Sequence, residues 1–212
     1  MPSRYNPYLK EDYFERIVFK EKAYWLGFLY AEGYIETRFN QPFRLGIEIS
    51  TKDEILIDRF IKAIGLEPSR KFYRSRDNTA CVRFANKEFI NNLVKNGCVP
   101  RKSKIISLPE LKNRELYLAF LLGFFDGDGK QGTTRIVTGS INFLIQIKEK
   151  FNLQYKIYLK ISRGTYIRGK EIKGQGYSMS LGVKLFNEML DNYKNSLKRK
   201  RIAFKVRNKK NS

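Results

Sequence analysis

Two segments of this chain are near copies of each other, and they constrain the fold more than any other feature. Trp25 to Gly33 reads WLGFLYAEG, and Leu121 to Gly129 reads LLGFFDGDG. Residues four apart lie on one face of a helix, and small side chains there let two helix backbones approach closely. Each copy has such a pair: Gly27 and Ala31, then Gly123 and Gly127. The repeat therefore predicts two helices packed against each other through these faces.

Each copy ends with an acid followed by a glycine. Gly33 and Gly129 are expected to end the helices in the left-handed conformation that glycine accepts. Glu32 and Asp128 then fall at helix C-termini, where the macrodipole is negative and a carboxylate costs roughly 0.3–1 kcal/mol. Because packing would bring both acids and both negative helix ends together, the pattern favours a bound cation.

The charge of the chain indicates a polyanionic partner. Lys and Arg number 42 against 21 Asp and Glu, which gives a net charge of +21. Such an excess favours nucleic acid or an anionic membrane surface. No apolar run reaches the length of a bilayer span, and the polar start MPSRYNPY predicts no secretory leader. We therefore expect a nucleic-acid partner, no membrane, and an intracellular location in the cytoplasm or nucleoid of a prokaryote or in an organelle.

The absence of histidine narrows the chemistry. The chain has no His, which excludes His-based nucleases, His-ligated metals and Ser-His triads. Cys81 and Cys98 have neither metal-ligand nor disulfide-framework spacing, which is typical of a reducing compartment. Oxygen ligands remain, and these suit Mg²⁺, Ca²⁺ or Mn²⁺.

Hydrophobic alternation and turn signals after each copy predict the same order of elements. In the first half, strands over 34–39 and 44–50 are joined by a turn at 40–42, and Thr51 with Glu54 suggests a capping box for a helix ended by Gly65. A hairpin over 71–85 and a helix over 87–95 follow. In the second half, a compressed strand region over 130–138 precedes a helix over 140–151, an alternating strand over 154–162, a strand over 177–182 and a helix over 183–193.

The predicted fold class is α+β, with two pseudo-symmetric αββαββα halves. We expect an N-terminal half over 1–98, a connector over 99–113, a C-terminal half over 114–193 and a basic tail over 194–212. The tail is interpreted either as a solvated end or as a phosphate-contacting segment.

The two motifs, their spacing and this order of elements resemble the LAGLIDADG homing endonucleases, and the segment GCVPRKS (97–103) is similar to that family's connector. The resemblance covers about Tyr24 to Tyr193. It implies motif helices at a central interface and saddle-shaped antiparallel β-sheets over DNA. It also implies a monomer that makes metal-dependent double-strand cuts with 3′ overhangs in a long asymmetric site, encoded within an intron.

Carried over by position, the resemblance makes Glu32 and Asp128 the metal-binding acids, with main-chain groups near Ala31 and Gly127. Mg²⁺ is the expected metal; Mn²⁺ is expected to substitute, and Ca²⁺ to bind without supporting cleavage. One acid from each half agrees with a phosphodiesterase that holds divalent ions against the scissile phosphates. Asp126 competes as a ligand, but its counterpart is Tyr30, so the symmetry of the motifs argues against it.

Auxiliary catalytic groups and DNA contacts are less constrained by the sequence. Lys52 could polarise water or neutralise transition-state charge, or could be a surface lysine at a helix start; Lys130 is the nearest substitute in the second half. Strands that line a groove should present polar, basic and aromatic side chains on one face. The expected DNA-binding residues are Tyr34, Glu36, Arg38, Arg44, Glu48, Arg70, Arg74, Arg76, Arg83, Arg135, Gln154, Lys156, Tyr158, Lys160, Ser178 and Ser180.

Two other functions remain open at this stage. An intron-splicing maturase would use the same fold and basic charge to bind intron RNA. A non-catalytic DNA-binding regulator on this fold would be expected to lose the two acids, which this chain keeps.

Overall fold

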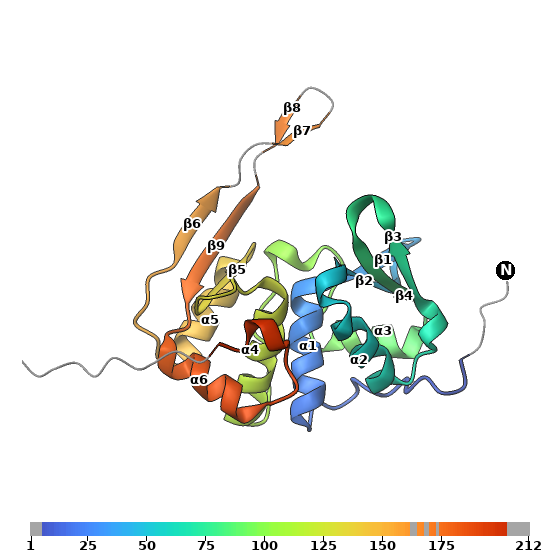
Figure 1. The fold of residues 1–212 in the computed structure, drawn as a ribbon, viewed down its shortest axis with the longest axis horizontal. Helices are drawn as coiled ribbons and strands as arrows, with labels where there is room; N and C mark the ends of the chain where they lie inside the picture. Colours follow the sequence, from blue (N-terminus) through green and yellow to red (C-terminus); the bar gives the residue numbers. More distant parts are fainter. Residues whose placement is uncertain (1–5, 162–164, 168–169, 173, 203–212) are drawn as a thin grey trace, which may run out of the picture.

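A computed structural model describes residues 6–161, 165–167, 170–172 and 174–202. Its centre is a pair of helices, α1 (Lys20–Glu32) and α4 (Arg114–Asp128), which lie side by side (Figure 1). These helices hold the two repeated segments, so the predicted central helix pair is confirmed.

The two helices run parallel and touch backbone to backbone at the predicted small residues. A Cβ atom added at Gly27 would collide with the carbonyl oxygen of Phe120, and one added at Gly123 would collide with that of Tyr24. These two contacts are equivalent, since Phe120 and Tyr24 each precede a motif glycine by three positions. Glycine is therefore required at both sites by the approach of the partner backbone.

Alanine at Gly27 or Gly123 is expected to destabilise the protein. The added methyl group must push the partner backbone away, which costs about 1–3 kcal/mol in an overpacked core. Urea denaturation should show a lower midpoint for either variant. Gly176→Ala is a suitable control, because its Cβ would lie 3.2 Å from the carbonyl oxygen of Thr138; an equal loss of stability there would contradict the explanation.

The first half follows the expected order of elements. It contains a single antiparallel sheet of order β1-β2-β4-β3 with α2 and α3 packed in the same half (Figure 1). The bounds are β1 (Gly33–Arg38), β2 (Gln41–Ser50), α2 (Ile55–Ile64), β3 (Lys71–Arg74), β4 (Thr79–Phe84) and α3 (Lys87–Lys95).

The second half has a smaller sheet than the αββαββα order predicts. Its order is β5-β9-β6, and the strand expected directly after α4 is reduced to one bridge between Gly129 and Ile136. The segment between α4 and α5, which begins at Ile141, is too short to form a full hairpin like that of β1 and β2. The bounds are β5 (Arg135–Thr138), α5 (Ile141–Lys150), β6 (Tyr158–Ile161), β9 (Gln175–Ser180) and α6 (Val183–Asn192). The α+β class is confirmed.

The strand predicted over 154–162 is also shorter than expected. It begins only at Tyr158, its apolar residues Leu159 and Ile161 are 53% and 65% exposed, and Ser162 lies outside the described residues. This strand is the sheet edge and continues toward a further hairpin, β7 (Thr165–Ile167) and β8 (Lys170–Ile172), which projects away from the helices (Figure 1). No strand is predicted from the sequence between residues 162 and 177.

Two local predictions about helix ends are wrong. Gly33 and Gly129 have φ of −76° and −81° and extended ψ, so they start the following extended segments and are not left-handed caps. A Cβ at Gly33 would instead lie 2.8 Å from the carbonyl oxygen of Leu29. The Thr51–Glu54 capping box does not form, because α2 begins at Ile55 and Glu54 itself is the N-cap residue. The Glu54 carboxylate accepts a hydrogen bond from the Tyr73 hydroxyl and lies 3.2 Å from the Lys71 ammonium.

One hydrophobic core joins the halves. It includes the apolar face of the first sheet (Leu45, Ile47 and Val82) and the aromatic rings of both motif helices. Cys81 and Cys98 are free and buried. Among the described residues no helix is both long and apolar enough to cross a bilayer.

Candidate metal and nucleic-acid site

The two motif acids lie next to each other at the C-terminal ends of α1 and α4. A Cβ at Gly127 would lie 3.4 Å from the Glu32 carboxylate oxygen Oε1, which places Glu32 against the last turn of α4. Glu32 is half-buried, whereas Asp128 is accessible to solvent. The parallel packing at the glycines thus brings one carboxylate from each half to the same end of the helix pair.

The electrostatics of the site show that the two carboxylates interact. Burial, followed by the charge of Asp128, raises the pKa of Glu32 to about 7. Although Asp128 still contacts solvent, the protein atoms packed around its carboxylate partly desolvate it and raise its pKa to about 6. A carboxylate whose ionisation is opposed by burial and by a like charge is stabilised when a cation binds beside it.

Two lysines that the sequence analysis did not select complete the site. Lys102 and Lys200 are 7% and 6% exposed, and the positive charge of each lowers the pKa of both Glu32 and Asp128. Their positions in the chain are equivalent, since Lys102 follows the last helix of the first half and Lys200 follows the last helix of the second. The sequence feature that could have identified these two lysines is the cluster of basic residues after each of these helices.

Lys200 occupies the negative end of α4. Its ammonium donates hydrogen bonds to the carbonyl oxygens of Phe125 (3.2 Å), Asp126 (2.7 Å) and Gly127 (2.8 Å). Burial lowers the pKa of this lysine. The helix end that was predicted to attract a cation therefore already holds one from the chain itself.

The other candidates from the sequence, which are two lysines, Asp126 and the basic tail, do not all lie at this site. Lys52 and Lys130 are exposed, and their catalytic roles stay predictions. Asp126 is buried and accepts hydrogen bonds from the Tyr24 hydroxyl and the Leu197 N–H, both at 2.6 Å, which are structural partners and not metal contacts. Of the predicted basic tail, residues 194–202 fold back onto the protein, while 203–212 lie outside the described residues.

The oxygen donors fit a hard divalent cation. Two carboxylates with main-chain carbonyls nearby form an all-oxygen donor set, which suits Mg²⁺ or Ca²⁺. Within the described residues no cluster of three or more His, Cys, Asp or Glu side chains is arranged for a metal. Such a cation would therefore need further oxygen ligands from water or from a substrate phosphate.

The coupled acids predict a pH dependence of stability. Both folded-state pKa values lie above the ordinary values of 4.5 and 3.8, so the folded protein binds more protons than the unfolded chain between about pH 4 and 7. The free energy of unfolding of the metal-free protein should therefore fall as the pH rises through this window. Added Ca²⁺ should raise the melting temperature more at about pH 8 than at about pH 5, because it requires the ionised acids.

Differential scanning fluorimetry with and without Ca²⁺ measures this effect, and Glu32→Gln is the control. The variant should show a flatter pH dependence and a smaller Ca²⁺ shift. A Ca²⁺ shift that is unchanged by the substitution would show that the ion binds elsewhere.

The open face of the first sheet carries most of the predicted DNA contacts. Strand register places these residues on the face opposite the core: Tyr34, Glu36, Arg44, Glu48, Arg74 and Arg83. Glu48 accepts hydrogen bonds from Tyr34 (2.6 Å), Arg74 (2.7 Å) and Arg83. Burial opposes the ionisation of Glu48, but these hydrogen bonds and the arginine charges outweigh it, so the pKa of Glu48 is lowered. The acids on this face are paired with arginines, so the face is preorganised and retains positive charge. Phe72, 39% exposed, also lies on it and was missed.

The remaining first-half candidates lie at the margins of this sheet. Arg38 ends β1, where its guanidinium stacks over the Phe39 and Phe43 rings, with centroid distances of 5.2 Å and 5.6 Å. Arg70 precedes β3, and Arg76 lies in the β3–β4 turn.

In the second sheet, register places Arg135, Tyr158, Lys160 and Ser180 on one open face, with the Arg135 guanidinium 5.5 Å from the centre of the Tyr158 ring. Ser178 shares that face but is completely buried, so a direct contact with DNA was wrongly predicted for it. Its neighbours on β5 and β6 cover its small side chain. Gln154 and Lys156 are exposed but precede β6, so the sheet register does not orient them.

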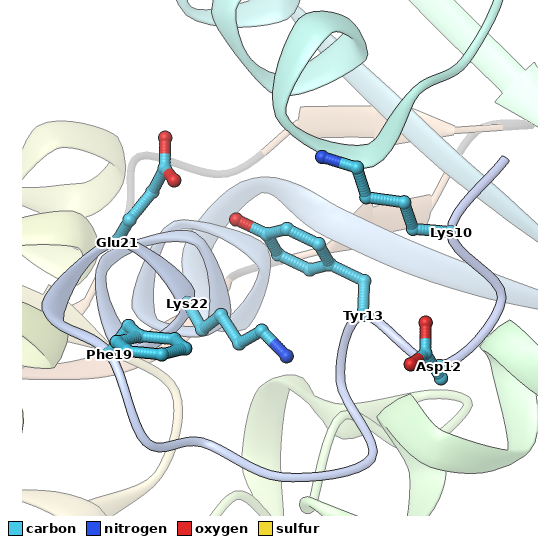
Figure 2. A pocket seen from close by; sticks show the side chains of 6 residues that line it. All are labelled: Lys10, Asp12, Tyr13, Phe19, Glu21 and Lys22. Atoms are coloured by element: carbon cyan, nitrogen blue, oxygen red, sulfur yellow. The ribbon is translucent and has the colours of Figure 1, made fainter. Parts of the chain in front are cut away.

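A cavity at the other end of α1 is separate from the acids. It is lined by residues on and before the start of α1, and in Figure 2 the hydroxyl of Tyr13 points between Glu21 and the ammonium of Lys10. Glu32 lies eleven positions after Glu21, so the cavity lies roughly 16 Å along the helix from the site.

No family model and no curated protein matches the sequence. Solved structures do resemble the fold. The I-LtrWI LAGLIDADG homing endonuclease bound to target DNA has 13% identity, with 90% of this chain and 87% of that chain covered and a TM-score of 0.48. I-WcaI bound to its DNA recognition sequence has 16% identity, with 86% and 87% covered and a TM-score of 0.49. I-SmaMI bound to uncleaved DNA target in the presence of calcium ions has 14% identity, with 81% and 84% covered and a TM-score of 0.45.

Of these similar structures, I-LtrWI is a LAGLIDADG homing endonuclease and I-WcaI is a homing endonuclease. The family of I-LtrWI is the one that the two sequence motifs resemble. At identities of 13–16% the likeness concerns the overall fold, and the chemistry of this chain rests on its own residues.

Proposed function

We propose that this chain is a LAGLIDADG homing endonuclease, encoded within an intron, that cuts both strands of a long, asymmetric DNA site in a reaction requiring Mg²⁺ and acts as a monomer. The observation that carries the proposal is the meeting of Glu32 and Asp128, one from each half, beside the buried ammonium groups of Lys102 and Lys200. The arginine-rich open face of the first sheet and the basic face of the second supply a surface for a duplex.

The residues divide the reaction between them. Glu32 and Asp128 would hold divalent cations, which when bound activate water and stabilise the leaving oxygen. Lys102 and Lys200 add positive charge that is fixed before the substrate arrives, and preorganised charge stabilises the negative charge that develops on a phosphate in the transition state. Because the duplex has two strands and the site has two similar halves, one acid and one lysine from each half would serve both cuts. The expectation of 3′ overhangs comes from the family that the two motifs resemble.

The exposed arginines would orient the duplex over the acids. Those on the first sheet, Arg44, Arg74 and Arg83, are positioned by ion pairs, as in the Arg44–Glu36 pair with a nitrogen–oxygen distance of 2.9 Å. Phosphate contacts fix the register of DNA on the protein, and base-edge contacts specify sequence.

The test is cleavage of a plasmid that carries the joined sequences flanking the gene. With Mg²⁺ the protein should convert the supercoiled plasmid to a linear product with 3′ overhangs; with Ca²⁺ it should bind and not cut. Binding to this site without cleavage in Mg²⁺ or Mn²⁺ would overturn the proposal and favour a DNA-binding regulator.

A further inference from the structure

The segment that carries Lys200 is anchored to both halves of the protein. Arg201 donates hydrogen bonds to the carbonyl oxygens of Tyr193 (2.8 Å) and Leu190 (2.7 Å) at the end of α6. Arg199 donates to the Asp53 carboxylate (2.6 Å) in the first half. These contacts hold residues 197–201 across the C-terminal ends of the motif helices.

Asp126 makes the most buried of these anchoring contacts. It is 3% exposed, and its Oδ2 atom accepts hydrogen bonds from the backbone N–H of Leu197 and from the Tyr24 hydroxyl, each at 2.6 Å. Leu197 begins a single 3-10 turn, because its carbonyl oxygen accepts a hydrogen bond from the N–H of Lys200 at 3.0 Å. Asp126 therefore holds one end of a turn whose other end is Lys200.

The same turn of α4 receives both ends of this connection. The side chain of Asp126 binds Leu197, and the main-chain oxygen of Asp126 accepts the Lys200 ammonium at 2.7 Å. The Leu197 contact is therefore the buried anchor of this turn, in addition to the contacts that Arg199 and Arg201 make on either side of Lys200.

The equivalent residue of the first motif has a matching contact. Tyr30 corresponds to Asp126, and its hydroxyl donates a 2.7 Å hydrogen bond to the carbonyl oxygen of Asn96, just after α3. That segment continues to Lys102, the other buried lysine. In each half, the motif residue two positions before the acid fastens the segment that delivers a lysine to the site.

We propose that Asp126 is a positioning residue, whose hydrogen bond to the Leu197 N–H sets the place of the Lys200 ammonium beside Glu32 and Asp128. This inference rests on the proposed function, because Lys200 is assigned to cleavage there. Asp126 touches neither substrate nor metal in this scheme and acts through Lys200.

Three substitutions test the proposal. Asp126→Asn keeps an oxygen that can accept from Leu197, Asp126→Leu removes it, and Lys200→Met removes the positioned group. Asp191→Asn is the matched control for charge, since Asp191 is exposed and pairs only with the neighbouring Lys194 at 3.0 Å in the described residues. A duplex with each strand labelled separately gives the cutting rate of each strand.

We expect Asp126→Leu to slow cleavage by roughly 10–100-fold, the usual effect of losing a residue that orients a functional group. The strand that is slowed more should be the same strand as in Lys200→Met, and DNA affinity should change little. Asp126→Asn and Asp191→Asn should cut within about threefold of the wild type. Wild-type rates for Asp126→Leu, or a strand preference opposite to that of Lys200→Met, would overturn the proposal.

A second readout does not depend on cleavage. In protein with ¹⁵N-labelled lysine, the Lys200 ammonium should give a signal protected from solvent exchange, assigned by its loss in Lys200→Met. The signal should persist in Asp126→Asn and disappear in Asp126→Leu while the far-UV circular dichroism is unchanged. A protected signal in a folded Asp126→Leu protein would contradict the positioning role. A wild type that shows the signal but never cuts would overturn only the proposed function.

Discussion

Glu32→Gln and Asp128→Asn should each abolish double-strand cleavage while leaving DNA binding largely intact. Each substitution keeps the size of the side chain but removes the negative charge that would hold a divalent ion. We expect cleavage to fall by on the order of 10²–10³-fold or more, the scale of losing a preorganised electrostatic group at a reacting centre. Rates from a Mg²⁺-dependent plasmid assay, with affinities from a Ca²⁺-dependent gel shift, separate the two effects.

The surrounding charges predict a second property of these variants. Because Glu32 is destabilised in its ionised form by burial and by Asp128, the amide should not weaken the fold of the metal-free protein. Equal or higher thermal stability together with lost cleavage would indicate a functional acid. If a variant still cuts both strands at the wild-type rate, the acid that it lacks is not part of the catalytic site.

Lys200→Met and Lys102→Met should produce the next largest loss. The ammonium groups are buried beside the acids, so their charge is little screened and would act directly on the developing charge of the phosphate. We expect a decrease in the cleavage rate of roughly 10²–10³-fold for each variant, with DNA affinity reduced far less. Single-turnover rates at saturating protein measure the chemical step apart from binding.

Lys52→Ala and Lys130→Ala provide matched controls, because both side chains are exposed and each change removes one positive charge. They also test the two lysines that the sequence suggested. If these variants stop cleavage and the buried-lysine variants do not, the assignment given to Lys102 and Lys200 is wrong.

The sequence predicted what depends on local pattern. Small residues four positions apart in each apolar segment, Gly27 with Ala31 and Gly123 with Gly127, predicted the two central helices. Alternation at Leu45, Ile47 and Ile49 correctly identified a core-facing strand. The acids could be selected because a carboxylate at a helix C-terminus is unfavourable unless a cation compensates it. These features are encoded within a few residues of each other.

The sequence could not predict what depends on contacts between distant segments. Lys102 and Lys200 are hydrophilic residues in basic segments, and only the return of each segment to the motif helices buries them. Asp126 was ambiguous for the same reason, since its partner Leu197 is 71 positions away. Within the described residues, the strand expected after α4 is reduced to a bridge between Gly129 and Ile136, a detail that turn signals alone do not resolve.

The proposed cleavage depends on the binding of divalent ions by Glu32 and Asp128 together, beside a DNA duplex. The most direct test is anomalous diffraction from crystals of the protein with its DNA site and Mn²⁺. We expect a peak within about 2.0–2.6 Å of carboxylate oxygens from both residues, the range for oxygen ligands of hard cations, with a phosphate oxygen completing the coordination. A duplex bound across the sheets with Mn²⁺ ligated by neither carboxylate would contradict it.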